Sequence, residues 1–206
     1  MKKFAWAAAL FLMTGLAQAD VVAPDVLVKS TAQDVISIIK NDKDLQNGDQ
    51  KKVLALVDAK ILPNFDFTRM TQLAAGRYWR QATPEQRNAL VSEFRTMLVR
   101  TYTKAFTQYK GETIDVKPLK LAPTDTETTV RTQLLKPGGQ PTDVDYVMRK
   151  SDAGWKVFDV VIEGVSMVTS YRSSFASQIE QSGIDSLIKS LADLNAKAAT
   201  MKADAK

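Results

Sequence analysis

Apolar residues in the first half of the chain recur every three or four positions. Val28 and Val35 illustrate this spacing, which places such residues on one face of an amphipathic helix. Asn47-Gly48 interrupts the pattern, and Pro63 ends a second apolar run that begins near Val53, because proline cannot continue a helix. The pattern therefore predicts two helices before Pro63.

Two further helices are predicted between Phe65 and Tyr109. The first ends at Gly76, which suits the C-terminal cap of a helix. The second begins with the capping box Thr83-Pro84-Glu85-Gln86, whose first and last residues can exchange side-chain-to-backbone hydrogen bonds. We expect this long helix to run to about Tyr109.

After Gly111 the apolar period changes to two, which is the period of a β-strand. Alternating residues predict four strands, over 114–119, 126–135, 144–149 and 155–162. Pro137-Gly138-Gly139 and Asp152-Ala153-Gly154 form turns between them. Four consecutive strands with short turns predict an antiparallel meander.

The order of these elements predicts the fold class. Helical segments over 25–110 and 165–199, the latter interrupted at Gly183, flank the sheet region over 112–163. We therefore expect an α+β fold, in which an antiparallel sheet of about four strands is covered on one face by N-terminal and C-terminal helices that enclose an apolar pocket. No linker or internal repeat is visible, so residues 20–206 should form a single domain.

The N-terminus has the pattern of a secretory signal peptide. Lys2 and Lys3 precede an apolar run of 13 residues, Phe4–Leu16, and Ala17-Gln18-Ala19 supplies the cleavage pattern. The run is shorter than the roughly 20 residues that a membrane-spanning helix needs, so we expect cleavage of residues 1–19. The chain contains no cysteine, which excludes disulfides and a lipid-modified cysteine, and we expect a free, soluble mature protein.

Charge and composition exclude several classes of function. The net charge of +5 is spread along the chain, without the dense basic patches of a nucleic-acid-binding protein. Histidine is absent as well as cysteine, which removes Ser-His and Cys-His dyads and the usual zinc ligands. No nucleotide-binding or calcium-loop motif is present. We expect no cofactor and no metal.

Carboxylates remain a source of acid–base chemistry. A buried Asp-Tyr pair in a cone-shaped α+β domain can abstract a proton, and Asp145 beside Tyr146, or Asp159, could act as the base. Neighbouring residues of a strand point to opposite faces. The simpler interpretation is that Asp145 is a solvated residue at the edge of the sheet.

Large apolar side chains concentrate in the segments that should cover the sheet. They are Phe65, Phe67, Met70, Met97, Phe106, Met148, Met167 and Phe175. An ordinary core accounts for such residues, but flexible methionines with rigid rings also suit a cavity whose occupant varies in shape. The two interpretations stay open on these residues alone.

A series of motifs resembles the MlaC family, the periplasmic component of the system that maintains the lipid asymmetry of the outer membrane. The motifs are Phe65-Asp66-Phe67-Thr68-Arg69-Met70, Gly76-Arg77-Tyr78-Trp79-Arg80-Gln81-Ala82-Thr83-Pro84-Glu85-Gln86-Arg87, Phe94-Arg95, Arg100-Thr101-Tyr102, Val144-Asp145-Tyr146, Trp155-Lys156-Val157-Phe158-Asp159-Val160, Glu163-Gly164-Val165-Ser166, Tyr171-Arg172-Ser173-Ser174-Phe175 and Gly183-Ile184-Asp185. They follow the order of the family from Phe65 to Leu194. Each motif is weak alone, and the series is specific.

The resemblance implies a monomeric periplasmic phospholipid carrier without catalysis or cofactor. Such proteins hold acyl chains in a deep apolar pocket between sheet and helices, with the head group near solvent. They move lipid between an outer-membrane MlaA-type lipoprotein with its porin and the MlaD-type ring of an inner-membrane ABC transporter. A non-catalytic periplasmic adaptor with a filled core and an acid–base enzyme using Asp145 or Asp159 are the rival classes.

Alternation and helical facing predict the residues that line the pocket. They are Phe67, Met70, Leu98, Tyr102, Val130, Leu134, Tyr146, Met148, Val160, Val165, Met167 and Tyr171. Arg77 and Arg80 have two interpretations. They could grip a head group or a partner protein, or they could stabilise their loop by hydrogen-bonding backbone carbonyls or Asp66 while Trp79 fills the fold. The capping box that follows the loop favours the second interpretation.

Overall fold

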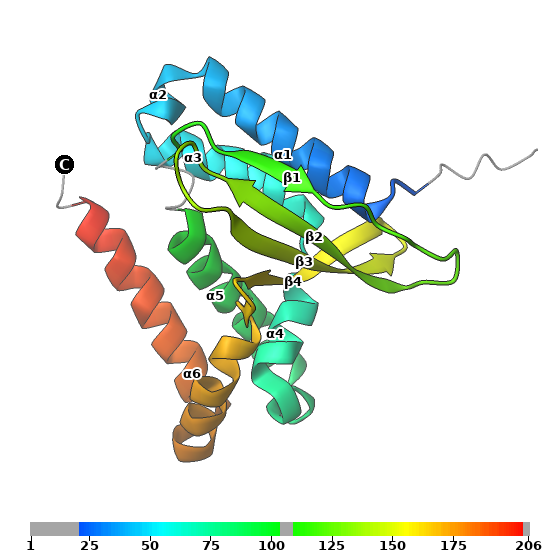
Figure 1. The fold of residues 1–206 in the computed structure, drawn as a ribbon. Coiled ribbons are helices and arrows are strands. Elements are labelled where there is room, and N and C mark those ends of the chain that lie inside the picture. Colours follow the sequence, from blue (N-terminus) through cyan, green and yellow to red (C-terminus); the bar gives the residue numbers. More distant parts are fainter. Residues whose placement is uncertain (1–20, 104–108, 204–206) are drawn as a thin grey trace, which may run out of the picture.

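The structure, a computed structural model, describes residues 21–103 and 109–203 (Figure 1). The predicted signal peptide and Phe106 lie outside these residues. The N-terminal region consists of α1 (Pro24–Asn41), α2 (Lys43–Gln46), α3 (Gln50–Leu56), a π-helical turn η1 (Val57–Ile61) and a 3-10 turn η2 (Leu62–Asn64).

The predicted break at Asn47-Gly48 is confirmed, and the structure adds a break at Asp42. The second helix was expected to stop at Pro63, but its α-helical part ends at Leu56 and Pro63 lies within the 3-10 turn η2. The Asp42 carboxylate accepts hydrogen bonds from the backbone N–H groups of Asp44 and Leu45 at 2.9 and 3.2 Å. This side chain caps a new helix, so one amphipathic stretch becomes α1 and α2.

Helix α4 (Phe67–Ala75) is defined by a cap at each end. The Asp66 carboxylate accepts a hydrogen bond from the Arg69 N–H at 2.9 Å. At the other end Gly76 adopts a φ of 56°, a conformation that favours glycine. The predicted end at Gly76 is therefore confirmed.

A 3-10 turn, η3 (Gly76–Arg80), leads to the long helix α5 (Pro84–Thr103). The predicted capping box is confirmed, because the Thr83 N–H donates to Gln86 Oε1 at 3.0 Å and the Gln86 N–H donates to Thr83 Oγ1 at 3.2 Å. The predicted continuation over 104–108 lies outside the described residues.

The predicted antiparallel meander is confirmed, with one strand more than expected. Strands pair in chain order: β1 (Thr113–Val116), β2 (Glu127–Leu135), β3 (Thr142–Ser151), β4 (Gly154–Ile162) and β5 (Val165–Ser166). Between β3 and β4 the register shifts, so that Val147 pairs with Asp159 while Met148 pairs with Val157. This β-bulge leaves Phe158 as the extra residue.

The expectation that helical structure resumes at Val165 is wrong. Glu163 and Gly164 both have positive φ, 48° and 78°, and form a tight turn that returns the chain along β4 as β5. A 3-10 turn, η5 (Thr169–Tyr171), then leads to α6 (Arg172–Ala203). Gly183, at φ 81°, interrupts α6 as predicted.

Helices cover both faces of the sheet, so the expectation of one covered face is wrong (Figure 1). Val147 and Met148, which point to opposite faces, belong to different apolar clusters. Met148 shares a cluster with Val28 of α1, whereas Val147 packs against a cluster that contains Met70 of α4. Helical periodicity reveals an apolar stripe, but it does not show which face of the sheet that stripe covers.

Candidate functional site

The face of the sheet that α1 covers is apolar along most of its length, and we call it the apolar sheet face. Its buried members are Val130, Met148, Trp155, Val157 and Val160, and its half-buried members are Ile114, Val116, Val144, Tyr146, Ile162 and Met167. The bulge at Phe158 explains why residues 155, 157 and 160 of β4 all contribute to it. The opposite face carries polar residues on β2 and β3, such as Arg131 and Asp145.

Burial on the apolar sheet face falls from one end to the other. Val130 and Met148 are fully buried. In the row of cross-strand neighbours next to that of Val130, Val144 and its partner Ile162 are half-buried. Val165 of β5, which pairs with Ile162, is 63% exposed. The sheet therefore offers an apolar surface that its own chain covers only in part, and an apolar ligand can cover the remainder.

Tyr146 lies in the middle of this surface. It sits on the central strand β3 between Val130 and Val160, which are both buried. Burial raises the pKa of the Tyr146 hydroxyl to about 12, although the side chain as a whole is only half-buried. The hydroxyl is therefore neutral near pH 7, and it places a single hydrogen-bonding group among apolar neighbours.

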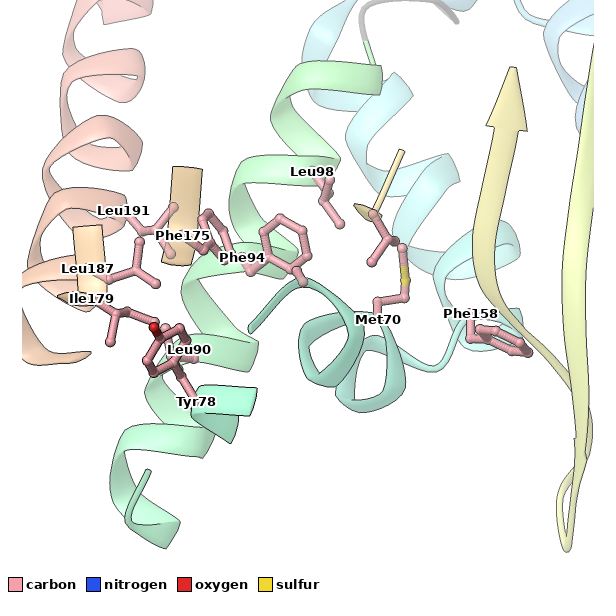
Figure 2. Close-up of a cluster of buried hydrophobic side chains, with 12 residues drawn as sticks. Met70, Tyr78, Leu90, Phe94, Leu98, Phe158, Phe175, Ile179, Leu187 and Leu191 are labelled. Atoms are coloured by element: carbon pink, nitrogen blue, oxygen red, sulfur yellow. The ribbon is translucent and has the colours of Figure 1, made fainter. Parts of the chain in front are cut away.

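A second apolar cluster fills the space between α4, α5 and α6 (Figure 2). Phe94 of α5 is fully buried, and its ring meets the rings of Tyr171 and Phe175 edge to face, at centroid distances of 5.3 and 5.2 Å. Burial, reinforced by the hydrogen bond with Tyr102, raises the pKa of Tyr171 to about 12. We call this cluster the helical cluster, and edge-to-face packing of its rings gives it a fixed geometry. Its buried members are Met70, Ala74, Tyr78, Leu90, Phe94, Leu98, Phe158, Val168, Phe175, Ile179, Leu187 and Leu191.

The structure divides ten of the twelve predicted pocket residues between these two clusters. Five contribute to the apolar sheet face: Val130, Tyr146, Met148, Val160 and Met167. Five belong to the helical cluster or pack against it: Phe67, Met70, Leu98, Tyr102 and Tyr171. Phe65 packs against both clusters, but the twelve residues do not form one cluster.

The two remaining predicted residues lie at the open end of the sheet. Leu134 is half-buried and pairs with Ile114 of β1. Val165 is exposed, and it lies on the apolar sheet face opposite Ile162. Its motif suggested the start of a helix, whereas the turn at Glu163 and Gly164 places it on a two-residue edge strand.

Sequence reasoning missed several members of the apolar sheet face. Ile114, Val116, Val144 and Ile162 are on it by the same alternation that identified Tyr146, so the signal was available. Leu27 and Val28 also pack there. Their position depends on how α1 crosses the sheet, which no local pattern reveals.

Arg77 and Arg80 do not share one role. Arg77 Nη2 lies 2.5 Å from Glu180 Oε1 and 2.6 Å from the Tyr78 hydroxyl. The Tyr78 hydroxyl, which also bonds to Glu180, is the main cause that lowers the pKa of the Glu180 carboxyl, and Arg77 adds to it. The Arg80 residue is exposed.

The backbone carbonyls of the loop and Asp66, the partners predicted for these two arginines, are bonded by other arginines. Arg87 Nε donates to the Trp79 carbonyl at 3.0 Å, and Arg87 Nη2 donates to the Arg80 carbonyl at 3.3 Å. Asp66 forms its ion pair with Arg149, at 3.0 Å. Tyr78, rather than the half-buried Trp79, is the aromatic residue that the loop buries.

The two candidate catalytic carboxylates lie on the neighbouring strands β3 and β4. Asp159 is buried, and it accepts hydrogen bonds from Ser166 Oγ at 2.5 Å and from the Val168 N–H at 3.2 Å. These bonds fix the segment between β5 and α6. Asp145 lies on the central strand β3, not at an edge as expected, and its neighbour Tyr146 points to the other face.

The fold and the site together define a class of protein: an α+β meander with helices on both faces and a candidate site made of apolar side chains. Within residues 21–103 and 109–203, no helix has the length and apolar character to cross a membrane. The chain belongs to the MlaC family, because the family profile described as MlaC protein matches residues 29–193. The resemblance seen in the motifs is confirmed.

Similar proteins include two curated relatives and one solved structure. The chain is 25% identical over 181 residues to the Intermembrane phospholipid transport system binding protein MlaC of Haemophilus influenzae, which covers 86% of this chain and 84% of the relative. It is 25% identical over 179 residues to the Toluene tolerance protein ttg2D of Pseudomonas putida, covering 86% and 81%. A phospholipid-binding protein from Ralstonia solanacearum, solved in complex with a phospholipid, is 40% identical, with a TM-score of 0.77 over 85% of this chain and 98% of that one.

Proposed function

We propose that the protein binds a glycerophospholipid and carries it through the periplasm. The observation that carries the proposal is the partly uncovered apolar sheet face around Val144, Tyr146 and Ile162. A similar protein with 40% identity was solved with a phospholipid bound. The acyl chains cover the half-buried residues of this face, and the head group lies toward the accessible end of the sheet near Val165.

A carrier is needed because acyl chains are insoluble in water. Moving a phospholipid through water exposes about 30 methylene groups at about 0.8 kcal/mol each, or roughly 25 kcal/mol. A protein that offers an apolar surface removes most of this cost. Contacts with the tails then dominate the binding, so selectivity among head groups is weak.

The partners in this proposal are membrane complexes on either side of the periplasm. After removal of residues 1–19, the protein receives lipid at one membrane and delivers it at the other, between an outer-membrane MlaA-type lipoprotein with its porin and the MlaD-type ring of an inner-membrane ABC transporter. The ATPase of that transporter supplies the energy, and the cycle maintains outer-membrane lipid asymmetry.

Mass spectrometry of the native protein tests the proposal. The mature chain is purified from its own cells without detergent and examined intact and after solvent extraction. We expect a mass increase of one phospholipid, and glycerophospholipids of mixed head groups in the extract. A protein that is free of lipid, and that takes up none from vesicles, would contradict the proposal.

A further inference from the structure

A hollow lies on the surface between the start of α4, η3 and α5. It has a volume of about 340 Å³ and is lined by Thr68, Trp79, Pro84, Arg87, Asn88, Val91 and Ser92. We call it the α4–α5 hollow. None of these residues belongs to the apolar sheet face or to the helical cluster.

Two arginines on this side of α5 are held in place by aromatic rings. Arg87 lies over the ring of Trp79, with 5.5 Å from Cζ to the ring centroid, and Arg95 lies over Phe67 at 5.6 Å. Arg87, Val91 and Arg95 are spaced by four residues and share one face of the helix. A guanidinium stacked on a ring keeps its N–H donors in the plane, where they can meet a carboxylate. Arg95 Nη2 already pairs with the Asp58 carboxylate at 3.0 Å, so Arg87, which is also held by the carbonyls of Trp79 and Arg80, is the stacked arginine nearest the hollow.

The charge around the hollow is positive. Residues 67–96 contain five arginines and two glutamates, and two of these arginines, Arg77 and Arg95, form ion pairs with Glu180 and Asp58. Of the two glutamates, Glu93 is turned toward α6, where its Oε2 accepts a hydrogen bond from Asn195 Nδ2 at 2.7 Å. Glu85 is hydrogen-bonded to Thr83 at the start of α5. Arg80, which is one of the five arginines, is exposed and follows Trp79 in the chain.

The shape of this surface favours a protein partner over a lipid bilayer. A surface that inserts into a bilayer needs protruding apolar side chains, whereas the apolar atoms of Trp79, Pro84 and Val91 line a recess. The exposed large apolar side chains of the described residues lie elsewhere: Val21, Val22, Val26, Leu121, Leu135, Val165 and Leu194.

We propose that the α4–α5 hollow is the docking site for an acidic segment of a partner protein. One apolar side chain of that segment enters the hollow, and its carboxylates pair with Arg80 and Arg87. The inference rests on the proposed function only in that a lipid carrier has to dock where it loads or unloads. Charge complementarity of this kind increases the rate of encounter and fixes the orientation of the complex.

A crosslinking experiment in living cells tests the docking site. A photo-crosslinking amino acid replaces Gln81, an exposed residue two positions from Trp79, in the full chain expressed in its own organism. The exposed Asn88 in the hollow is changed to Glu or, as the matched control, to Gln, which has the same length without the charge. A crosslinker at Lys120, an exposed residue between β1 and β2, is the control position.

We expect Gln81 to yield a protein adduct whose crosslinked peptide has an excess of Asp and Glu. Asn88→Glu should lower the yield at least about fivefold relative to Asn88→Gln, because it places a like charge in the site, and Lys120 adducts should not change. Absence of a protein adduct at Gln81, an adduct with lipid only, a neutral or basic peptide, or equal yields for Glu and Gln would each overturn the inference.

Folding and lipid content are measured for both Asn88 variants by thermal unfolding and mass spectrometry. If Asn88→Glu fails to fold, the comparison of Ser92→Glu with Ser92→Gln takes its place. If both variants carry phospholipid but give equal adduct yields, only the proposed docking site is overturned. A chain without phospholipid would overturn the proposed function, whatever the adducts show.

Discussion

At the scale of the residue, the central question is what covers the half-buried side chains on β3 and β4. Val144 and Ile162 face each other across the two strands, and neither is fully buried. Accessible apolar surface on a sheet is unfavourable in water. A bound acyl chain would remove that surface from water and would explain why the chain leaves it uncovered.

A charge at this point should abolish lipid binding. Val144→Glu places a carboxylate against the tails, and a buried, unpaired charge is strongly unfavourable. We expect the phospholipid that co-purifies to fall at least about tenfold, which corresponds to about 1.4 kcal/mol. Leu135→Glu is the matched control, because Leu135 is exposed on the opposite face of β2. An equal loss of lipid in both variants, or no loss in either, would contradict the location of the site.

The hydroxyl groups of two tyrosines should lose their protons at a higher pH than an ordinary tyrosine. Burial raises the pKa of Tyr146 and of Tyr171 from 10 to about 12 in the folded protein. The folded state therefore holds these protons more tightly than the unfolded state, so their contribution to stability is fully present below pH 10 and is lost as the pH rises through 12. Tyr146→Phe should remove one late step from an ultraviolet titration of tyrosinate, and should weaken the loss of stability in this window. An unchanged titration would show that the Tyr146 hydroxyl is well solvated.

The bonds of Asp159 should contribute to stability, not to catalysis. Asparagine in its place keeps one acceptor oxygen and introduces an N–H₂ group next to two donors, Ser166 Oγ and the Val168 N–H. We expect Asp159→Asn to lower the free energy of unfolding by about 1–3 kcal/mol, measured by chemical denaturation. If the variant still carries lipid at low denaturant concentration, the substitution has lowered the stability of the fold without changing the lipid-binding site. A stability equal to that of the parent chain would show that the bonds are dispensable.

At the level of the helices, hydrogen bonds at two points along α5 join it to α6. Its capping box fixes its start, and Gln86 Nε2 also donates to Asp185 Oδ1 of α6 at 2.8 Å. Further along, Asn195 Nδ2 of α6 donates to the Glu93 carbonyl at 3.0 Å. These contacts hold α5 and α6 together around the helical cluster, so the α4–α5 hollow rests on a rigid support.

Loss of the cap should destabilise this support. Thr83→Ala removes the hydroxyl that accepts from the Gln86 N–H, and we expect a loss of about 0.5–2 kcal/mol in the free energy of unfolding. Thr101→Ala is the control within the same helix, because the exposed Thr101 hydroxyl only bonds back to the Met97 carbonyl. Its effect should stay within about 0.5 kcal/mol. Equal effects of the two substitutions, by thermal or chemical unfolding, would contradict the capping role.

At the scale of the whole molecule, local patterns predicted the elements better than their arrangement. The meander, the capping box and the break at Gly183 follow from period, turn chemistry and caps, all of which are local. The crossing of α1 over the sheet depends on contacts between distant residues. The bulge at Phe158 and the return of β5 after Gly164 are local, but they break the regular alternation from which the strands were predicted. For this reason the residues of the predicted pocket were apolar and mostly interior, but their division between two clusters was not foreseen.

The most direct test of the account is to map where an acyl chain lies in the loaded protein. The mature protein is loaded with a phospholipid that carries a photoreactive group within one acyl chain, then irradiated, digested and analysed by mass spectrometry. We predict that the labelled residues lie on the apolar sheet face, around Val144, Tyr146 and Ile162. Labelling confined to the polar face of the sheet or to the outer surface of the helices would contradict the account.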